Sequence, residues 1–208
     1  ILPSQLLSLG VGISGSYNYT EVASETAKPL FANAVKNEYN FDQKMYGPAV
    51  GIIVDTAVAY DLLMNYRFTV DYSLLSNTLS SSVFKERDVF HHIKVHSVIG
   101  FSPIRTSYLR FWIGPGFGIS YLQHKENRKE RATLFNVDCT VGLNVHISLQ
   151  FSTFVSISSG YTYGFSENVT NDSSNEMYFK NGDGHGLSVV FYYGVVFRFL
   201  DKYFPEVY

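Results

Sequence analysis

The chain has 208 residues and a net charge of −2; charged residues make up 16% of it, and Phe, Tyr and Trp together make up another 16%. A typical soluble domain carries about 25% charged residues. So many aromatic residues exclude a disordered chain. The near-neutral charge argues against a nucleic-acid partner. A single Cys excludes a disulfide framework and a Cys-based zinc site. The apolar surface must therefore be kept from water by a core or by a membrane.

Apolar residues alternate with small or polar ones along nearly the whole chain, which is the period of a β-strand. Phe68 and Val70, for example, alternate with Arg67 and Asp71. No helical pattern and no run of 18 apolar residues is present, so no transmembrane helix is predicted. Eight strands are predicted in chain order, at residues 7–18, 46–60, 66–74, 89–101, 109–121, 133–147, 151–165 and 187–199.

The connections between these strands alternate in length, which predicts that long loops leave one rim of a barrel and tight turns leave the other. The short connections are residues 61–65, 102–107 and 148–150. The long connections are residues 21–44, 75–88, 122–131 and 166–186. No linker or repeat interrupts the pattern, so residues 1–208 are expected to form one domain.

The two faces of the predicted strands differ in charge. The apolar faces contain no Asp, Glu, Lys or Arg, as a lipid-facing wall requires. A lipocalin-like soluble barrel would instead show water-exposed Lys, Glu, Gln and Thr on its other face. Here that face consists of small residues with seven scattered charges, which fit the filled lumen of an eight-stranded barrel. We interpret these seven as a structural network of paired charges, with pore lining as the alternative: Asp55, Arg67, Asp71, Lys94, Arg110, Asp138 and Arg198.

Aromatic residues gather near both ends of the predicted strands, as two interfacial girdles would require. Near the long loops these are Tyr17, Tyr72, Tyr121, Tyr163 and Phe165, and near the tight turns they are Tyr60, Tyr66, Phe101, Phe151 and Phe199.

Two prolines fall inside predicted strands. Pro48 and Pro115 each remove a hydrogen-bond donor from the ladder, and a closed barrel has no free edge. We expect β-bulges at both positions, with Gly114 and Gly116 relieving the strain.

The stretches from Arg110 to Tyr121 and from Phe191 to Phe199 resemble the small eight-stranded outer-membrane barrels typified by OmpX and the OmpA transmembrane domain. The resemblance implies an all-β, eight-stranded antiparallel up-and-down transmembrane β-barrel with long extracellular loops and short periplasmic turns. It also implies a location in the bacterial outer membrane, with loops at the cell surface. The composition is reminiscent of spirochaetal surface barrels. Such barrels usually end at the aromatic residue that Phe199 matches, so residues 200–208 are expected to form a periplasmic tail; the alternative is that the last strand continues beyond Phe199.

Some lipid-modifying barrels carry a His-x-Ser pair and a carboxylate on the lipid-facing wall. His91 has the lipid-facing parity, but Ile93 stands where the Ser would be. His146 and Ser148 have the spacing but the lumen-facing parity, next to a tight turn. No catalytic site is therefore expected.

His92, Lys94 and His96 alternate on one lumen-facing strand, where hydrogen bonding is expected in preference to a metal site. Cys139 has the lipid-facing parity and is expected to act as a small hydrophobic residue. No metal and no cofactor are predicted.

The loops carry the residues from which specificity is predicted. The candidates are a basic group and an apolar group: Lys125, Arg128, Lys129 and Arg131, and Met177, Tyr178 and Phe179. The alternatives are a solvated hairpin loop for the basic group and an extension of the eighth strand for the apolar group. The predicted function is a non-enzymatic, monomeric surface protein of adhesin or immune-evasion type. Its expected partners are outer-membrane lipid and a host extracellular-matrix or serum protein. The alternatives are a lipid-modifying enzyme and a narrow channel.

Overall fold

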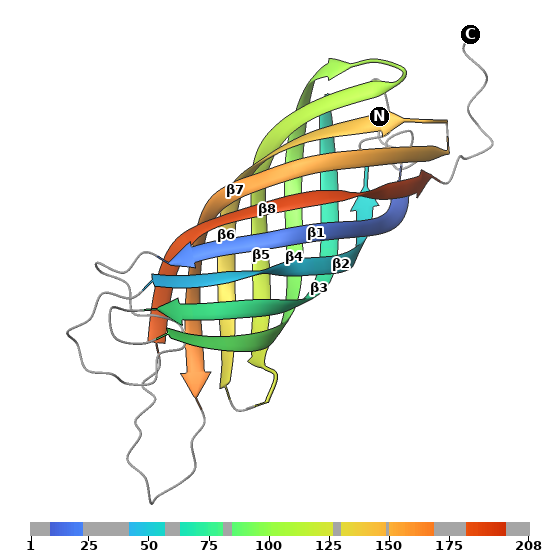
Figure 1. The fold of residues 1–208 in the computed structure, drawn as a ribbon. Coiled ribbons are helices and arrows are strands. Elements are labelled where there is room, and N and C mark those ends of the chain that lie inside the picture. Colours follow the sequence, from blue (N-terminus) through green and yellow to red (C-terminus); the bar gives the residue numbers. More distant parts are fainter. Residues whose placement is uncertain are drawn as a thin grey trace, which may run out of the picture.

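The computed structural model describes residues 9–22, 42–56, 63–80, 85–126, 130–148, 150–168 and 182–198. These residues form eight strands: β1 (Gly10–Val22), β2 (Asp42–Asp55), β3 (Met64–Ser80), β4 (Lys85–Arg105), β5 (Leu109–His124), β6 (Glu130–His146), β7 (Phe151–Asn168) and β8 (Gly182–Arg198). Each strand pairs antiparallel with its sequence neighbours, and β8 closes the barrel against β1 (Figure 1). The predicted all-β, eight-stranded antiparallel up-and-down barrel is confirmed, but the predicted alternation of loop lengths is not complete, because the connection 81–84 is shorter than the connection 56–63 at the opposite rim. No helix in the described part of the chain is long and apolar enough to span a membrane.

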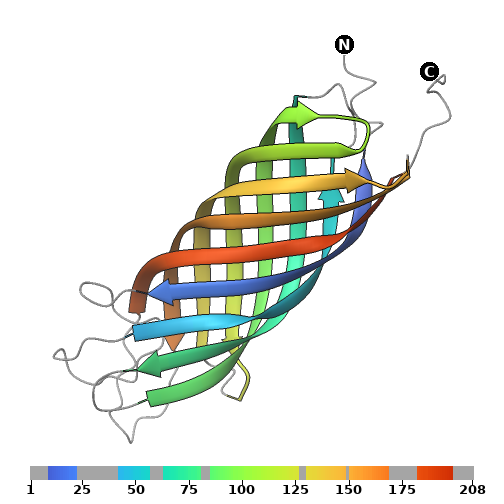
Figure 2. The same ribbon diagram turned by 45° about the horizontal axis from the view of Figure 1, so that its top comes forward.

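The strands are steeply inclined to the axis of the barrel, as Figures 1 and 2 show. The rim at which β1 begins and β8 ends also carries the connections 56–63, 106–108 and 147–150, and we call it the turn rim. The opposite rim carries the connections 23–41, 81–84, 125–129 and 169–181, and we call it the loop rim. The predicted periplasmic tail, residues 200–208, lies outside the described residues.

Several strands extend further toward the loop rim than predicted. β3 continues to Ser80 and β4 begins at Lys85, so most of the predicted loop 75–88 is strand. In the same way β5 and β6 occupy both ends of the predicted loop 122–131. Backbone pairing does not require apolar side chains, so the ladder continues where the apolar pattern ends. At the turn rim β2 ends early, at Asp55, which makes the connection 56–63 longer than the predicted turn 61–65.

The apolar side chains face outward and the polar side chains face the lumen. The outward side chains of Ile13, Val50 and Phe117, for example, are 67%, 66% and 53% exposed. Along the strands, exposed and buried side chains alternate. This confirms that the barrel shows its apolar face to its surroundings. The described members of the two predicted girdles are also exposed: Tyr17, Tyr66, Tyr72, Phe101, Tyr121, Phe151 and Tyr163. The side chains of Tyr60, Phe165 and Phe199 lie outside the described part.

The predicted bulges at the two prolines are wrong. The β2–β3 ladder is interrupted at Gly47 and Pro48 but resumes in the same register, and Pro115 pairs in register with Cys139. Among the described strand pairs, the register shifts between Phe101 and Ile104 on β4. The φ angle of a proline is compatible with a β-strand. The missing N–H therefore removes one hydrogen bond from the ladder but does not insert an extra residue, as a bulge would.

The two glycines beside Pro115 provide space rather than relief of strain. No described glycine has a positive φ. A Cβ atom on Gly114 would collide with the carbonyl oxygen of Ile99 on the neighbouring strand. A Cβ on Gly116 would collide with the carboxylate of Asp138 and lie 2.7 Å from His96 Nε2. These positions therefore require glycine because other atoms approach closely.

Candidate functional site

The seven charged residues assigned to the lumen are all buried inside the barrel. They do not form a single cluster but occupy successive levels along its axis, each with different partners.

The first level is built around Arg67. Its Nη2 and Nε atoms donate to Asp55 Oδ2 at 2.6 and 3.1 Å, and Nη2 also donates to Asn144 Oδ1 at 3.0 Å. The guanidinium carbon lies 4.6 Å from the ring centre of Trp112 and 4.1 Å from that of Phe154. These side chains come from five strands, so we call them the Arg67 layer. Together they fill a cross-section of the lumen.

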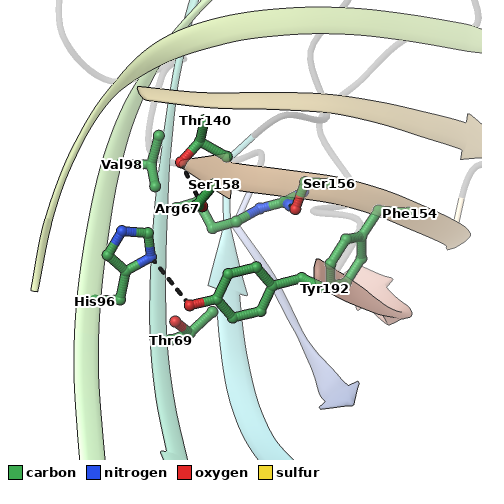
Figure 3. Close-up of a pocket in the computed structure, with 9 residues that line it drawn as sticks. All are labelled: Arg67, Thr69, His96, Val98, Thr140, Phe154, Ser156, Ser158 and Tyr192. Atoms are coloured by element: carbon green, nitrogen blue, oxygen red, sulfur yellow. Dashed lines mark hydrogen bonds between the residues drawn. The ribbon is translucent and has the colours of Figure 1, made fainter. Parts of the chain in front are cut away.

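Next to this layer, His96 Nε2 lies 2.9 Å from Asp138 Oδ2, and Thr140 Oγ1 donates to Asp138 Oδ1 at 2.9 Å. The Tyr192 ring stacks on His96 with centroids 5.9 Å apart and 1° between the planes. Tyr192, His96 and Arg67 line the same pocket (Figure 3). The volume of this cavity is about 10 Å³. A cavity of this size holds about one water molecule.

Lys94 lies on the loop-rim side of this level. Its ammonium group is 5.7 Å from the Tyr192 ring centre and is attracted by the carboxylates of Asp71 and Asp138. Asp71 also accepts a hydrogen bond from Ser14 at 3.1 Å. A second cavity of about 20 Å³ adjoins Lys94. The charges here have opposite charges or polar groups as neighbours, as burial requires.

At the turn rim, two arginines bind neutral partners. Arg198 Nη2 donates to His146 Nδ1 at 2.7 Å, and Arg110 Nε donates to Ser102 Oγ at 2.8 Å. The hydroxyl of Ser148 accepts backbone hydrogen bonds within the turn, including one from Phe151 N at 3.1 Å. His146 and Ser148 thus take part in separate interactions, and the structure does not bring them together as a catalytic pair.

His92 Nδ1 lies 2.8 Å from Ser73 Oγ, so the alternating histidines of β4 bind different partners. Within the described ranges, no group of three or more His, Cys, Asp or Glu side chains could hold a metal ion. Cys139 is exposed on the outward face.

The lumen near the loop rim is filled by apolar side chains, a feature that the sequence analysis did not predict. We call this cluster the apolar plug; its members are Met45, Leu75, Phe90, Leu122, Ala132 and Leu134. Gln43 and Asn77 are hydrogen-bonded nearby at 2.9 Å. The signal was present in the sequence, because these residues have the lumen-facing parity. The strand pattern does not reveal them, because four of them fall in or beside segments whose sequence predicts loops.

Of the predicted ligand-binding residues, the structure describes two. Lys125 and Arg131 are exposed at the loop rim, at the end of β5 and the beginning of β6. Lys125 N donates to Val89 O at 2.9 Å, which fixes the end of β5 beside β4. Arg128, Lys129, Met177, Tyr178 and Phe179 lie outside the described residues.

Comparisons with known proteins agree with this architecture. No protein-family model matches the chain, and no curated protein matches its sequence. The outer membrane protein OprG from Pseudomonas aeruginosa is a similar solved structure, with a TM-score of 0.59 and 8% identity over 92% of this chain and 96% of that one. Neisserial surface protein A has a TM-score of 0.46 and 13% identity over 91% and 97%. The attachment invasion locus protein Ail of Yersinia pestis has a TM-score of 0.38 and 12% identity over 91% and 98%.

The protein therefore has the fold of the small eight-stranded outer-membrane β-barrels. Its outward apolar wall matches the lipid-facing band of such barrels. The fold and this apolar wall are those that a location in the bacterial outer membrane requires.

Proposed function

We propose that this barrel is a non-enzymatic surface protein whose extracellular loops bind an extracellular or host ligand. The observation that carries the proposal is the contrast between the lumen and the loop rim. The Arg67 layer and the apolar plug fill the lumen at two levels. Lys125 and Arg131 are exposed where the chain leaves the membrane. Binding residues of rigid scaffolds are commonly carried by such connections.

Neither alternative has a comparable observation in its favour. A channel needs a continuous passage, whereas the cavity beside Tyr192 and the cavity beside Lys94 are each only about the size of a water molecule. A lipid-modifying enzyme needs a nucleophile, a base and a carboxylate in contact. The two residues with the His-x-Ser spacing, His146 and Ser148, lie at the turn rim with separate partners.

The experiment replaces connections 125–129 and 169–181 by short Gly/Ser turns and leaves the strands intact. Cells that display the wild-type barrel or this variant are tested on immobilised fibronectin, on laminin and on whole serum proteins. The matched control replaces the turn-rim connection 106–108 in the same way. Heat-modifiable migration on gels shows that each barrel is folded.

We expect the wild-type barrel and the turn-rim control to bind at least one of these surfaces, and the variant with shortened loops to lose that binding. Equal binding by the folded loop variant would show that the loops are not the binding site. A wild-type barrel that binds none of the surfaces would also contradict the proposal for these ligand classes.

A further inference from the structure

A group of polar side chains lies on the outward face of β2, β3 and β4, close to the loop rim. Arg87 Nε donates to Ser76 Oγ at 3.0 Å. The hydroxyls of Ser76 and Thr78 hydrogen-bond to the Tyr46 oxygen, and the charges of Arg87 and Lys85 act on the same oxygen. We call this group the Tyr46 patch; its members are Tyr46, Ser76, Thr78, Lys85 and Arg87.

The register of the strands brings the members of the Tyr46 patch side by side. Tyr46 pairs with Ser76 across β2 and β3, and Thr78 pairs with Arg87 across β3 and β4. Lys85 is the next outward residue after Arg87 on β4. Three paired strands therefore hold the patch, and the hydrogen bond to Ser76 holds the Arg87 guanidinium against β3.

The Tyr46 patch lies beyond the level of the lipid headgroups. Ile93 of β4 pairs with the girdle residue Tyr72, so Arg87 and Lys85 stand six and eight positions beyond the girdle. The nearest member on β3, Ser76, stands four positions beyond Tyr72. Four positions are roughly 13 Å along the strand, or about 9 Å along the membrane normal at a tilt of about 45°. The headgroup region is only about 5–8 Å thick on each side. The patch therefore faces the medium outside the membrane.

The acidic residues of β4 do not belong to the outward face that carries the patch. Glu86 and Asp88 stand at the alternate positions, which have the lumen-facing parity. Asp88 Oδ1 lies 3.5 Å from His124 Nε2, on the lumen side of β5. Within the described part of the chain, no carboxylate forms an ion pair with Lys85 or Arg87. The patch itself thus carries two positive charges and no negative charge.

The side chains of the patch present hydrogen-bond donors to the outside. The hydrogen bonds from Ser76 and Thr78, together with the nearby Arg87 charge, lower the pKa of Tyr46. Because the Tyr46 oxygen is occupied by these bonds, its O–H group can donate to an acceptor outside the patch. Arg87 uses Nε on Ser76, so its Nη atoms can donate in the same direction, and the Lys85 ammonium has donors only. An oxyanion, which has acceptors only, satisfies all three groups.

We propose that the Tyr46 patch binds the sulfate or carboxylate groups of an extracellular acidic polysaccharide. An Arg guanidinium can bind such a group with two parallel hydrogen bonds, and a Lys ammonium attracts it as a point charge. The ring of the partly exposed Tyr46 offers an apolar surface to the C–H face of a sugar. This site is separate from the proposed ligand binding by connections 125–129 and 169–181, because its residues belong to β2, β3 and β4.

The test measures binding of the purified full-length barrel, in non-ionic detergent, to immobilised heparin and to neutral dextran by surface plasmon resonance. The wild type should bind heparin much more tightly than dextran. Lys85→Gln with Arg87→Gln should weaken heparin binding at least about tenfold, since hydrogen bonds to charged groups are the strong ones. Tyr46→Phe removes one hydroxyl and no charge, and it should weaken heparin binding about fivefold. The effect of Tyr46→Phe separates a built site from attraction between net charges.

The matched control is Lys44→Gln, which removes an outward basic residue of β2 that forms an ion pair with Glu21 at 3.5 Å. It should bind heparin as the wild type does, and heat-modifiable migration shows that each variant is folded. Equal binding of heparin and dextran by the wild type, or unchanged heparin binding by the folded double variant or by Tyr46→Phe, would overturn the proposal.

Two further outcomes would assign the binding to another partner or another site. Tighter binding of polyglutamate than of heparin would overturn the proposal, since the partner would then be an acidic peptide. The barrel with shortened connections 125–129 and 169–181 should still bind heparin, and loss of heparin binding in that variant would place the site in the loops. The same variant tests the proposed function on matrix and serum proteins, so the two proposals can fail separately.

Discussion

Arg67 and Asp55 are direct cross-strand neighbours in the register of β2 and β3, and their side chains form a buried salt bridge of 2.6 Å. The rings of Trp112 on β5 and Phe154 on β7 both lie against the Arg67 guanidinium. Arg67 thus connects β3 with β5, β6 and β7 as well as with its neighbour β2. Because the pair is shielded from water, removing the Asp55 carboxylate would leave the Arg67 charge buried without its ion-pair partner.

Replacing Asp55 by Asn should therefore destabilise the barrel strongly. The Asn keeps the shape of the side chain but leaves the Arg67 charge buried without its carboxylate, and loss of one partner of such a pair costs about 3–5 kcal/mol. The measurement is the free energy of unfolding by urea in lipid vesicles, followed by heat-modifiable migration. As the control, Asp55→Asn combined with Arg67→Met should recover most of the loss. A single variant as stable as the wild type would show that the pair has little structural role.

The architecture could be predicted from sequence because it depends on parity. Lipid contact excludes charge from every outward position, so the faces of strands such as β5 can be distinguished without knowledge of their neighbours. The same parity predicts that Arg67 and Asp138 face inward. The partners of these residues could not be predicted, since they depend on the register between strands. His96 becomes the partner of Asp138 because strands β4, β5 and β6 bring the two residues together.

The limits of the strands and the apolar plug were harder to predict for a related reason. Outside the membrane the outward positions no longer need to be apolar, so Ser76 and Thr78 lie on a strand whose sequence pattern has ended. Inside the lumen, Phe90 and Leu122 are apolar at positions where polar residues were expected. Near the loop rim the outward and the lumen-facing positions therefore no longer differ in polarity. The prediction of strand limits and of lumen residues depends on that difference.

A methyl group at Gly114 should impair folding, because it would collide with the backbone carbonyl of Ile99, and Ile99 is held in register with Tyr66 on β3. Gly114→Ala is expected to lower the free energy of unfolding by about 1–3 kcal/mol, the usual range for overpacking. Gly118→Ala is the matched control on the same strand, since its nearest atoms would lie at 3.3 Å and include the side chains of Asn136 and His96. The yield of refolded barrel in vesicles and the urea midpoint measure both effects. Equal loss in the two variants would contradict the assigned close approach at Gly114.

The wild-type barrel should show no discrete openings in planar lipid bilayers, because two barriers close the lumen in series. The Arg67 layer is polar and fills one level, whereas the apolar plug fills another and would resist wetting. Ion flow through the lumen requires both barriers to open. Removing one barrier alone should therefore leave the barrel silent.

The variants for this measurement are Phe90→Ala with Leu122→Ala, which shortens the plug, and Arg67→Ala, which opens the polar layer. Each is expected to remain without discrete steps, and the combination of all three changes should produce them. Heat-modifiable migration identifies the folded fraction, which matters because each large apolar side chain removed costs about 2–5 kcal/mol. Discrete openings of the wild type would show that the lumen conducts. Openings after loss of the plug alone would show that the Arg67 layer is not a barrier.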